Sequence, residues 1–596
     1  MILVFGGTTE GRKAAEVLEE AGSLYYYSTK TGEQELALHH GVRIDGALDA
    51  EAMKVFCREH QIRLIVDAAH PFASMLHRTI ADVTSDRPIP VVRYERIYPP
   101  RDPDITWIDD YSQVPTEIHT LLATTGVQSI SKLKWLEEQG VKAIYRILRR
   151  ESSLKMAYEQ GATDEQLCYF EDGLLPEADA ILLKESGLSG GFAEKVEEAK
   201  DKGMRIIVLK RPEFHFDNCV NGPYGLRRMV EKLLPEFYPL HSGLTTGTCA
   251  TAAAVGAAMM RVQGSGLRVK GSGFKIQDLP QEVPVVLPDG ETIHVPVTYG
   301  NGYVSVTKEA GDDPDVTDGI EVRVSLTPVP SPEGKGGVVI RGGIGVGRFT
   351  LPGFDYPPGE PAINKGPREM IRRNLEPFTL NHESLTVVIS VPQGEEIAKR
   401  TFNPRLGIEG GISIIGVSGI VEPFSEEAFI QSIHKCMEVA KASGSQRVVI
   451  NSGAKSERFV KAHYPTLPSQ AFVEYGNYIG ETLKIANELG FKKITLGVML
   501  GKAVKLAEGQ LDTHSRKGTM NLAFVQQMLD EANCQFSIQN SQLSLARELW
   551  EKLPKEKTEA FCQVVIRYCL KHCKPLVPQA ELTLLLIADD GTIHSL

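Results

Sequence analysis

A glycine-rich turn near the start of the sequence has the composition of a phosphate-binding loop. Residues 5–12 read FGGTTEGR, after a short apolar run and before an amphipathic one. Small residues let the backbone approach a pyrophosphate, and the first turn of a helix offers unpaired N–H groups. We therefore expect a nucleotide there; a plain strand–helix turn capped by threonine is the alternative. The residues expected to contact it are Gly6, Gly7, Thr8, Thr9, Glu10, Arg12 and Ser28.

The residues after the next predicted strand leave the form of that nucleotide open. Lys30 could bind a 2′-phosphate, whereas Glu33 could accept a hydrogen bond from a 2′-hydroxyl. If the ligand is a nicotinamide dinucleotide, the sequence is therefore compatible with both NADH and NADPH.

Two further predicted strand ends carry groups that could move a proton or bind an anion. His70 follows a buried strand in the stretch 67–73, and Lys184 begins a glycine-rich turn over 184–191. Because the carboxyl ends of parallel strands meet at one edge of a sheet, we expect His70 to face the same crevice as the glycine loop. We expect both His70 and Lys184 to be catalytic. The turn after Lys184 could also form an anion nest. A loop histidine with satisfied hydrogen bonds and an ordinary strand–helix turn are equally compatible with these residues.

Two segments further along the chain carry hydroxyls and carboxylates. Thr245 and Thr246 precede an Ala-rich helix, where hydroxyls and free N–H groups would suit a substrate carboxylate as well as simple capping. Residues 311–318 hold four carboxylates, of which Asp312 is our candidate base. Adjacent Asp312 and Asp313 and the following Pro314 disfavour a calcium loop, and a solvated acidic turn is the alternative.

Small polar residues follow several predicted strands between residues 410 and 510. Such loops at the carboxyl ends of a parallel sheet are the expected place for a nucleoside ligand. His514 follows and could face a ligand as a base, or make only a structural hydrogen bond. The candidate nucleoside-binding residues are Gly416, Ser418, Asn451, Gly453, Asn477 and Gly501.

Alternating strands and helices must position these groups in the first 238 residues. The apolar pattern predicts a helix over 11–21 and strands over 2–5, 24–28, 62–68, 90–94, 143–147, 180–184 and 206–209. We interpret them as a pair of Rossmann-like α/β layers, about 1–115 and 116–238.

A seam with Pro235 and Pro239 separates this part from a second one over 242–596. Residues 242–405 predict an α+β domain, with a helix over 249–261 and hairpin turns at Asp289-Gly290 and Asn301-Gly302. Residues 406–596 predict a small parallel α/β domain. Its expected strands are 412–416, 447–451 and 493–500, and its expected helices are 425–442 and 469–489. The fold class is therefore multidomain α/β and α+β.

Composition excludes several classes of protein. Of the 596 residues, 42% are hydrophobic and 24% charged, so the chain is not disordered. A net charge of −11 argues against a nucleic-acid partner, and no run is long and apolar enough to span a membrane. The nine scattered cysteines indicate reduced thiols in a cytoplasmic protein, and no metal site is predicted. A homo-oligomer remains open.

The N-terminal part resembles the precorrin-6A reductase family over about residues 1–235. The matching stretches are 6–12, 67–73, 184–191 and Arg211-Pro212, whereas Ala69, Glu33 and the stretch 152–178 depart from the family pattern. The resemblance implies reduction of a corrin precursor with NADH or NADPH.

The remainder resembles the cobalt-precorrin-5B C1-methyltransferase family over nearly all of 242–596. Its motifs are GLTTGTCA at 243–250, KEAGDDPDVTDG at 308–319, GEPAIN at 359–364, NPRLGIEGGIS at 403–413 and DTHS at 512–515. The resemblance implies transfer of a methyl group from S-adenosylmethionine to a tetrapyrrole, with an α+β domain before a small α/β domain.

Together the two resemblances imply a bifunctional enzyme of cobalamin biosynthesis. It would methylate C1 of cobalt-precorrin-5B and then reduce the product, cobalt-precorrin-6A, to cobalt-precorrin-6B. The substrate carries several carboxylates, for which we expect cations such as Arg211, Arg368 and Arg405. Two alternatives are a corrinoid-binding scaffold without turnover and an oxidoreductase of the nucleotide-sugar type fused to a domain of another role.

Overall fold

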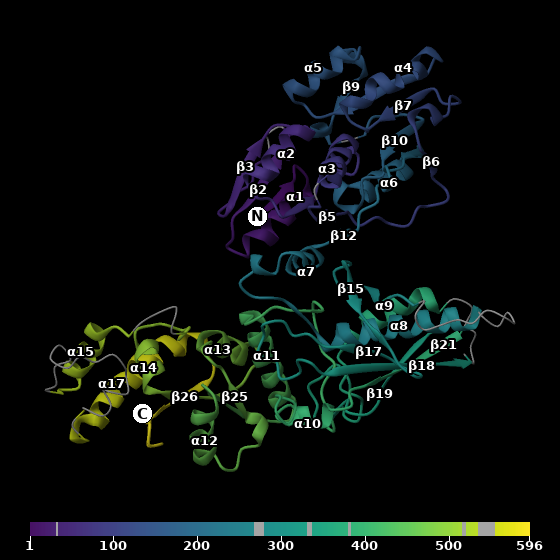
Figure 1. Cartoon of the computed structure of the whole chain (residues 1–596). Coiled ribbons are helices and arrows are strands. Elements are labelled where there is room, and N and C mark those ends of the chain that lie inside the picture. The colour runs from purple at the N-terminus through teal and green to yellow at the C-terminus, as the bar shows by residue number, and fades with distance from the viewer. Residues whose placement is uncertain are drawn as a thin grey trace. The chain divides into compact units, whose positions relative to one another are not determined.

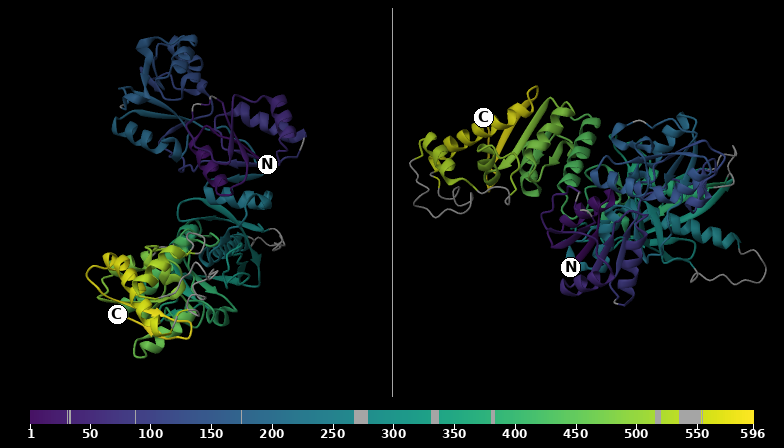
Figure 2. Two further views of the ribbon diagram at one scale, coloured as in Figure 1. Left: turned by 90° about the vertical axis from the view of Figure 1, so that its left-hand side faces the viewer. Right: turned by 90° about the horizontal axis from the view of Figure 1, so that it is seen from above.

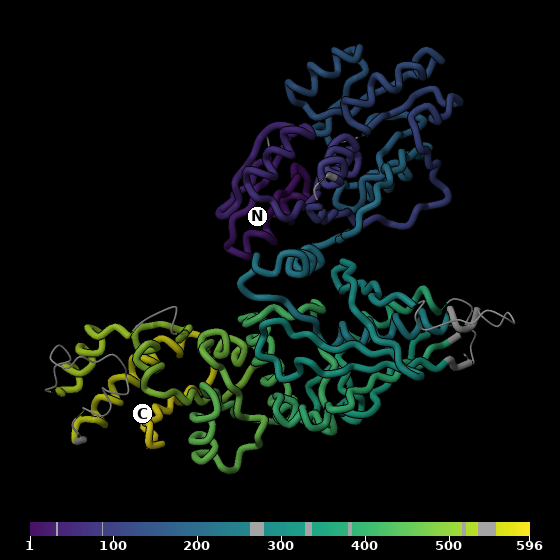
Figure 3. The backbone as a smooth tube through the Cα atoms, viewed as in Figure 1, coloured from purple at the N-terminus to yellow at the C-terminus, as the bar shows by residue number. Residues whose placement is uncertain are grey.

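The chain divides into two units. The computed structural model describes residues 1–596 apart from 31, 33, 87, 174, 267–278, 331–336, 380–382, 515–519, 535–552 and 554. The first unit comprises Met1–Ser242 and Pro284–Val295, and the second comprises Gly243–Val283 and Pro296–Leu596. Figure 1 labels their elements, Figure 2 shows two further views, and Figure 3 follows the backbone alone.

The first unit contains two parallel sheets, and the glycine loop follows β1, one of the two central strands of the first sheet. That sheet has the order β12-β5-β4-β1-β2-β3. Its strands are β1 (Ile2–Phe5), β2 (Tyr25–Thr29), β3 (Gly41–Asp45), β4 (Leu64–Asp67), β5 (Val91–Tyr94) and β12 (Asn218–Val220). Its helices are α1 (Thr9–Glu19), α2 (Ala50–Glu59), α3 (Ser74–Asp86) and α7 (Pro223–Leu233).

Helices cover both faces of this sheet because β1 is apolar on both. Ile2 and Val4 pack in one core with residues of α1 and α7. Leu3 and Phe5 pack in another with residues of α2 and α3. Side chains alternate between the faces of a strand, so a continuous apolar run fits a sheet buried on both sides.

The second sheet of the first unit has the order β6-β11-β10-β7-β8-β9 and is also parallel. Its strands are β6 (Thr106–Ile108), β7 (Thr120–Ala123), β8 (Lys142–Ile147), β9 (Leu167–Tyr169), β10 (Ala180–Lys184) and β11 (Arg205–Leu209). Its helices are α4 (Ile130–Glu138), α5 (Glu151–Glu159) and α6 (Phe192–Asp201). The predicted boundary near residue 115 does not divide the sheets, because β6 precedes it and β12 returns to the first sheet.

A hairpin from beyond residue 242 belongs to the first unit. Strands β14 (Glu282–Val286) and β15 (Thr292–Pro296) form it, with the predicted turn at Asp289-Gly290 and Gly290 at a φ of +94°. The buried Glu291 carboxylate accepts hydrogen bonds from the Tyr224 and Gly225 N–H groups in the first turn of α7. A Cβ at Gly222 would overlap this carboxylate, so glycine is required there. Glu291 thus caps a helix whose own N-terminal residue has no capping side chain.

The second unit begins with a mixed sheet covered by an Ala-rich helix. The sheet order is β16-β17-β18-β21-β19, and α8 packs against β17, β18 and α9 (Figure 1). The helices are α8 (Thr246–Gly266), α9 (Lys365–Leu375) and α10 (Gly394–Ala398). The sheet strands are β16 (Thr298–Tyr299), β17 (Val304–Thr307), β18 (Glu321–Pro330), β19 (Val338–Gly342) and β21 (Glu383–Ser390). Short pairs join β13 (Gly243–Leu244) to β23 (Ile420–Val421) and β20 (Arg348–Phe349) to β22 (Ile408–Glu409).

A second sheet in this unit has the order β25-β24-β26-β27-β28. Strands β24 (Arg447–Asn451), β25 (Phe472–Glu474), β26 (Lys493–Met499) and β27 (Glu581–Ile587) are parallel, and β28 (Ile593–His594) is antiparallel. Its helices are α11 (Glu426–Ala442), α12 (Ala454–His463), α13 (Ile479–Glu488), α14 (Leu500–Ala507), α15 (Leu522–Glu531) and α17 (Lys555–Cys573). The strand order reverses between β24 and β26, and that switch point is where open α/β sheets bind ligands.

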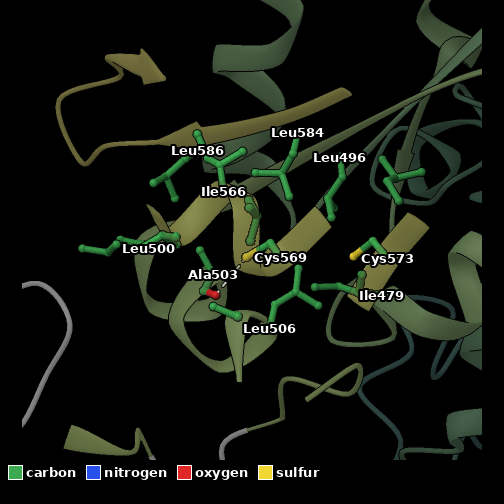
Figure 4. Packing of buried hydrophobic residues seen from close by; sticks show 14 of the residues in the cluster. Ile479, Leu496, Leu500, Ala503, Leu506, Ile566, Cys569, Cys573, Leu584 and Leu586 are labelled. Atoms are coloured by element: carbon green, nitrogen blue, oxygen red, sulfur yellow. Dashed lines mark hydrogen bonds between the residues drawn. The ribbon is translucent and has the colours of Figure 1, made fainter. Parts of the chain in front are cut away.

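Helix α17 packs its cysteines into the core of this sheet. Cys569 and Cys573 lie among aliphatic side chains from α14, β26 and β27 (Figure 4). The Cys569 thiol donates to the Ala503 carbonyl oxygen over 3.2 Å. Burial raises the pKa of both thiols, so these cysteines serve as small apolar core residues.

Two predicted elements are wrong. The predicted strand over 412–416 forms only isolated bridges, Ile412 with Val346 and Ile414 with Ile363, outside the parallel sheet. Within the predicted helix over 469–489, a 3-10 turn (Ser469–Ala471) leads into the short strand β25, and Gly476 at a φ of +56° separates this strand from α13. Apolar spacing alone did not distinguish a short buried strand from a helix there.

Candidate functional site

Side chains from β2 and from the residues that follow it cover the glycine loop after β1. Gly7 has a φ of +82°, and its N–H lies 3.2 Å from the Gln34 Oε1 and 3.3 Å from the Tyr27 hydroxyl. Gln34 Nε2 donates to the Thr8 carbonyl oxygen over 3.0 Å. A Cβ at Gly6 would overlap the Tyr27 ring, so Tyr27 approaches as closely as only glycine allows. A phosphate on the Gly7 N–H would have to displace Gln34.

Two of the other residues predicted to contact the nucleotide are exposed beside the loop, and two make hydrogen bonds within the protein. Thr9 and Arg12 are exposed beside it. The Thr8 hydroxyl accepts from the Gly11 N–H over 2.9 Å and donates to the Ala68 carbonyl oxygen over 2.7 Å. Ser28 is buried, and its carbonyl oxygen accepts from the Gly6 N–H. Thr8 therefore caps α1 and links β1 to the end of β4.

The Glu10 carboxylate joins the two sheets of the first unit. It is 5% exposed, lies 2.8 Å from Arg96 Nε and accepts a hydrogen bond from the Ser189 hydroxyl. Arg96 Nη1 in turn donates to the Ser186 carbonyl oxygen over 2.7 Å. Both carboxylate oxygens thus have partners within the protein, in an arrangement that holds the glycine loop against the turn after β10.

His70 and Lys184 come together although they follow strands of different sheets. Both lie near the Phe72 ring: the His70 ring at 5.8 Å and the Lys184 Nζ at 5.1 Å from its centroid. The Phe72 N–H donates to His70 Nδ1 over 3.2 Å, which leaves the proton of the neutral imidazole on Nε2. Burial, with the charges of Arg96 and Lys184, lowers the pKa of His70 to about 3. Burial also lowers the pKa of Lys184 to about 8, close to the range in which an amine can exchange protons.

A cavity of about 340 Å³ lies beside these groups. Its lining residues are Pro71, His77, Arg93, Glu95, Arg211, Pro212, Glu213, Phe214, His215, Phe216 and Cys219. Arg211, predicted for substrate binding, stacks on Tyr98 with its guanidinium carbon 3.7 Å from the ring centroid and pairs with Glu185 at 2.9 Å.

Buried charges behind this cavity fix the segment that carries His70. Asp67 Oδ2 lies 2.6 Å from His77 Nδ1, and Asp67 Oδ1 lies 3.0 Å from Arg93 Nη1. His77 Nε2 faces the His70 carbonyl oxygen at 3.1 Å, and Arg93 also donates to the Ala69 carbonyl oxygen. Sequence reasoning missed His77 and Arg93, because their role depends on contacts across elements.

The glycine-rich turn after Lys184 does not form the open anion nest that was one interpretation of it. The N–H groups of Leu188, Gly190 and Gly191 donate to the carbonyl oxygens of Ile97, Gly187 and Leu188. A Cβ at Gly187 would lie 2.9 Å from the Arg96 Cβ. The glycines therefore allow the turn to wrap around Arg96.

A second cavity, of about 400 Å³, lies at the switch point of the sheet in the second unit. Its lining residues are Ser452, Asn477, Met499, Gly501, Lys502, Lys505, Thr513 and His514. Three predicted residues, Asn477, Gly501 and His514, are among them. The lining combines small polar groups with two cations, which suits a nucleoside that carries a carboxylate.

Backbone contacts hold the loops of this cavity in place. Asn451 is buried; its Oδ1 accepts from the Gly453 N–H over 3.0 Å, and its Nδ2 donates to the Val473 carbonyl oxygen. The Thr513 N–H donates to the Asn477 carbonyl oxygen over 3.0 Å. Lys502 donates to the Gly476 carbonyl oxygen, and burial lowers its pKa. Asn451 and Gly453 thus shape the loop, whereas Ser452 faces the cavity.

Comparisons with known proteins identify both parts of the chain. Residues 1–230 match the family model described as precorrin-6x reductase CbiJ/CobK, and residues 235–423 match the CbiD model. A cobalt-precorrin-5B C(1)-methyltransferase of Prosthecochloris aestuarii is 38% identical over 59% of this chain and 95% of its own length. The chain belongs to the cobalt-precorrin-5B C(1)-methyltransferase family. It is a fusion of that methyltransferase with a precorrin reductase, which confirms the predicted pair of enzymes.

Two further relatives accompany this match. A cobalt-precorrin-5B C(1)-methyltransferase of Geobacillus kaustophilus is 40% identical over 49% of this chain and 76% of its own length. A crystal structure of the cobalamin biosynthesis protein cbiD from Archaeoglobus fulgidus is 27% identical and covers 44% of this chain and 78% of its own, with a TM-score of 0.24. We refer below to the first unit as the reductase unit and to the second as the methyltransferase unit.

Gly416 and Ser418 lie elsewhere in the methyltransferase unit than predicted. They belong to a segment that wraps the first turn of α8, and neither lines the cavity at the sheet. The Thr246 hydroxyl accepts from the Ile415 N–H over 2.9 Å, and the Thr248 hydroxyl donates to the Gly419 carbonyl oxygen over 2.6 Å. A Cβ at Gly416 would overlap the Thr245 side chain. The Thr245 hydroxyl accepts from the Thr248 N–H over 3.2 Å, which is the capping alternative, and the other two threonines fasten the segment.

The arginines predicted for substrate binding in this unit make internal contacts. Arg368 is 6% exposed, donates to the Ile363 carbonyl oxygen over 2.9 Å and stacks on Tyr356. Arg405 pairs with Glu457 on α12 at 2.8 Å. Burial of Arg368 contradicts its predicted contact with substrate, since its guanidinium is used to hold a turn.

Most of the acidic turn also has internal partners. Asp315 lies 2.8 Å from the buried Lys308 Nζ. Asp313 accepts from the Phe424 N–H over 2.9 Å, and Asp318 accepts from the Ala310 N–H over 2.8 Å. Asp312 is exposed on the same turn. The turn is thus a structured loop that presents Asp312 to solvent.

No helix in the part of the chain that the structure describes is long and apolar enough to cross a membrane. Lys30 is exposed beyond the end of β2, whereas Glu33 lies outside the described residues.

Proposed function

We propose that the two units catalyse consecutive steps on one macrocycle. The methyltransferase unit transfers a methyl group from S-adenosylmethionine to C1 of cobalt-precorrin-5B, and the reductase unit reduces the resulting cobalt-precorrin-6A with a nicotinamide cofactor. The two family matches in one chain carry this proposal, since one family is named for methylation of cobalt-precorrin-5B and the other for reduction of a precorrin-6, the compound class that such a methylation would give.

S-adenosylmethionine fits the cavity between β24 and β26. Gly501 and Ser452 allow close approach of a nucleoside at the strand ends, and Asn477 offers a polar contact on the opposite loop. Lys502 and Lys505 supply positive charge for the carboxylate of the methionine moiety. The cofactor, when bound, supplies the methyl group.

The nicotinamide cofactor fits the glycine loop after β1. Gly7 and Thr9 are exposed there, and Arg12 stands beside them as a cation for the pyrophosphate or a further phosphate. Gln34 occupies the Gly7 N–H, so we propose that it moves aside when the dinucleotide binds. The cofactor, when bound, supplies a hydride to the macrocycle.

We assign proton transfer to two side chains in the reductase unit and to two candidates in the methyltransferase unit. In the reductase unit, the neutral His70 presents an Nε2–H, and Lys184 is a cation below about pH 8. In the methyltransferase unit, His514 lines the cavity and Asp312 is exposed on the acidic turn, and either can accept the proton that C-methylation releases. Arg211 at the reductase cavity is placed to bind a substrate carboxylate.

A product assay tests the proposal directly. The full chain is incubated with cobalt-precorrin-5B and S-adenosylmethionine, then with NADH or NADPH, and products are read by mass. A gain of one methylene equivalent followed by two hydrogens is expected. Tight substrate binding with no mass change would instead support the scaffold alternative.

A further inference from the structure

The end of strand β25 brings an unassigned carboxylate to the nucleoside crevice. Glu474 is the last residue of β25, and it is in register with Asn451, the last residue of the neighbouring β24. Both strands therefore end at the same edge of the sheet. Sequence reasoning missed Glu474 because the stretch 469–489 was predicted as a helix.

The Glu474 carboxylate lies over the loop that follows β24. A Cβ added to Gly453 would be 3.1 Å from Glu474 Oε1, so glycine gives the carboxylate room. Lys502, which lines the cavity, has a pKa that the negative charge of Glu474 raises against the effect of burial. The approach to Gly453 and the electrostatic effect on Lys502 place the carboxylate beside the loop that carries Ser452, next to the residues that line the cavity.

The same carboxylate is available to a ligand. Its side chain is 27% exposed, and among the described residues it accepts no hydrogen bond. The nearest cation is Arg405, whose Nη1 is 3.8 Å from Glu474 Oε2 but only 2.8 Å from Glu457 Oε2. Arg405 therefore pairs mainly with Glu457 and makes only a long ion pair with Glu474.

We propose that Glu474 accepts hydrogen bonds from the ribose hydroxyls of the nucleoside bound in this crevice. An ionised carboxylate is purely an acceptor with two oxygens, which matches a vicinal pair of hydroxyl donors. In dinucleotide-binding sheets, an acidic residue about 20 residues beyond the glycine turn takes this role at the end of the second strand. Glu474 holds the equivalent place relative to Gly453. The proposal rests on the assignment of S-adenosylmethionine to this cavity.

The test compares two probe ligands on the full chain by calorimetry. S-adenosylhomocysteine carries the ribose diol, and its 2′-deoxy analogue lacks one hydroxyl. Because a hydrogen bond to a charged group contributes about 1.5–3 kcal/mol, wild type should prefer the diol by roughly 10- to 100-fold. In Glu474→Ala this preference should fall to within about twofold, and in Glu474→Gln, which keeps one acceptor, it should be intermediate. The exposed Glu481→Gln, on α13, is the matched control and should keep the full preference.

The outcomes separate this inference from the function on which it rests. Wild type that binds both probes equally, or Glu474→Ala that keeps the full preference, overturns the role of Glu474 and leaves the cavity assignment standing. Failure of S-adenosylhomocysteine to bind wild type, or binding unaffected by Gly501→Val, overturns the cavity assignment itself. Thermal melting of each variant shows whether it is folded. If Glu474→Ala does not fold, Glu474→Gln alone decides: a preference equal to that of wild type overturns the proposal.

Discussion

Removing the Glu10 carboxylate should destabilise the reductase unit rather than only weaken its cofactor binding. Glu10 is 5% exposed and its partner Arg96 is 7% exposed, so Glu10→Leu leaves a guanidinium buried without its anion. Breaking one side of a buried ion pair costs about 3–5 kcal/mol. With a urea dependence of about 3 kcal/mol per molar for a unit of this size, the urea concentration at the unfolding midpoint should fall by about 1–1.7 M.

Tryptophan fluorescence measures this change in the intact chain. Trp107 and Trp135 both lie in the reductase unit, and replacing the third tryptophan, Trp550, with phenylalanine makes the signal specific to that unit. Arg96→Leu alone should destabilise similarly, but the double variant should recover most of the loss, because an apolar pair replaces the ion pair. If the urea concentration at the unfolding midpoint of Glu10→Leu lies within about 0.2 M of that of the parent, the structural role of Glu10 is refuted. A selective loss of nicotinamide binding in this variant would instead indicate that Glu10 binds the cofactor.

Four further predictions address the sites and the hairpin. Gly7→Val should abolish nicotinamide binding but spare methyl transfer, since a branched side chain disfavours a φ of +82°; NADPH titration beside a methylation assay checks both. Lys184→Arg should extend reductase activity above about pH 8 if the cation is required, as a pH–rate profile would show. Burial raises the pKa of Glu291 to about 7 in the folded protein, so the folded state binds this proton more tightly than the unfolded chain does. The stability of the reductase unit should therefore fall as the pH rises towards 7. In Glu291→Gln, the urea concentration at the unfolding midpoint should no longer decrease over this pH range. Gly501→Val should weaken S-adenosylhomocysteine binding at least tenfold, and an unchanged dissociation constant in calorimetry would contradict the cavity assignment.

Elements with one dominant local signal could be predicted from the sequence. The bounds of β1, β10 and β24 agree with the predicted strands, because each is a continuous apolar run that the sheet buries on both faces. The hairpin turns at Gly290 and Gly302 agree as well, since both require a positive φ. The approach of His70 to Lys184 could not be predicted from the edge of one sheet, because the two residues follow strands of different sheets.

Roles that depend on contacts between distant residues could not be predicted. Arg368 has the same charge whether it binds a substrate carboxylate or a backbone carbonyl, and only its burial distinguishes the two. The run over 412–416 has the composition of a strand, but the Thr246 hydroxyl takes the N–H of Ile415. Glu474 follows a strand of three residues, which is too short for periodicity to reveal.

The hairpin Pro284–Val295 also sets the order in which the nascent chain can complete its folding. The reductase unit needs Glu291 to cap α7, yet the ribosome makes this residue only after α8 of the methyltransferase unit. At a translation rate of about 5–20 residues per second, the ribosome needs roughly 3–10 s to extend the chain from Ser242 to Val295. During this interval the first turn of α7 lacks its acceptor, while the apolar α8 is being synthesised. Translation speed across this stretch should therefore affect the yield of folded reductase, although no residue of the reductase family match is encoded there.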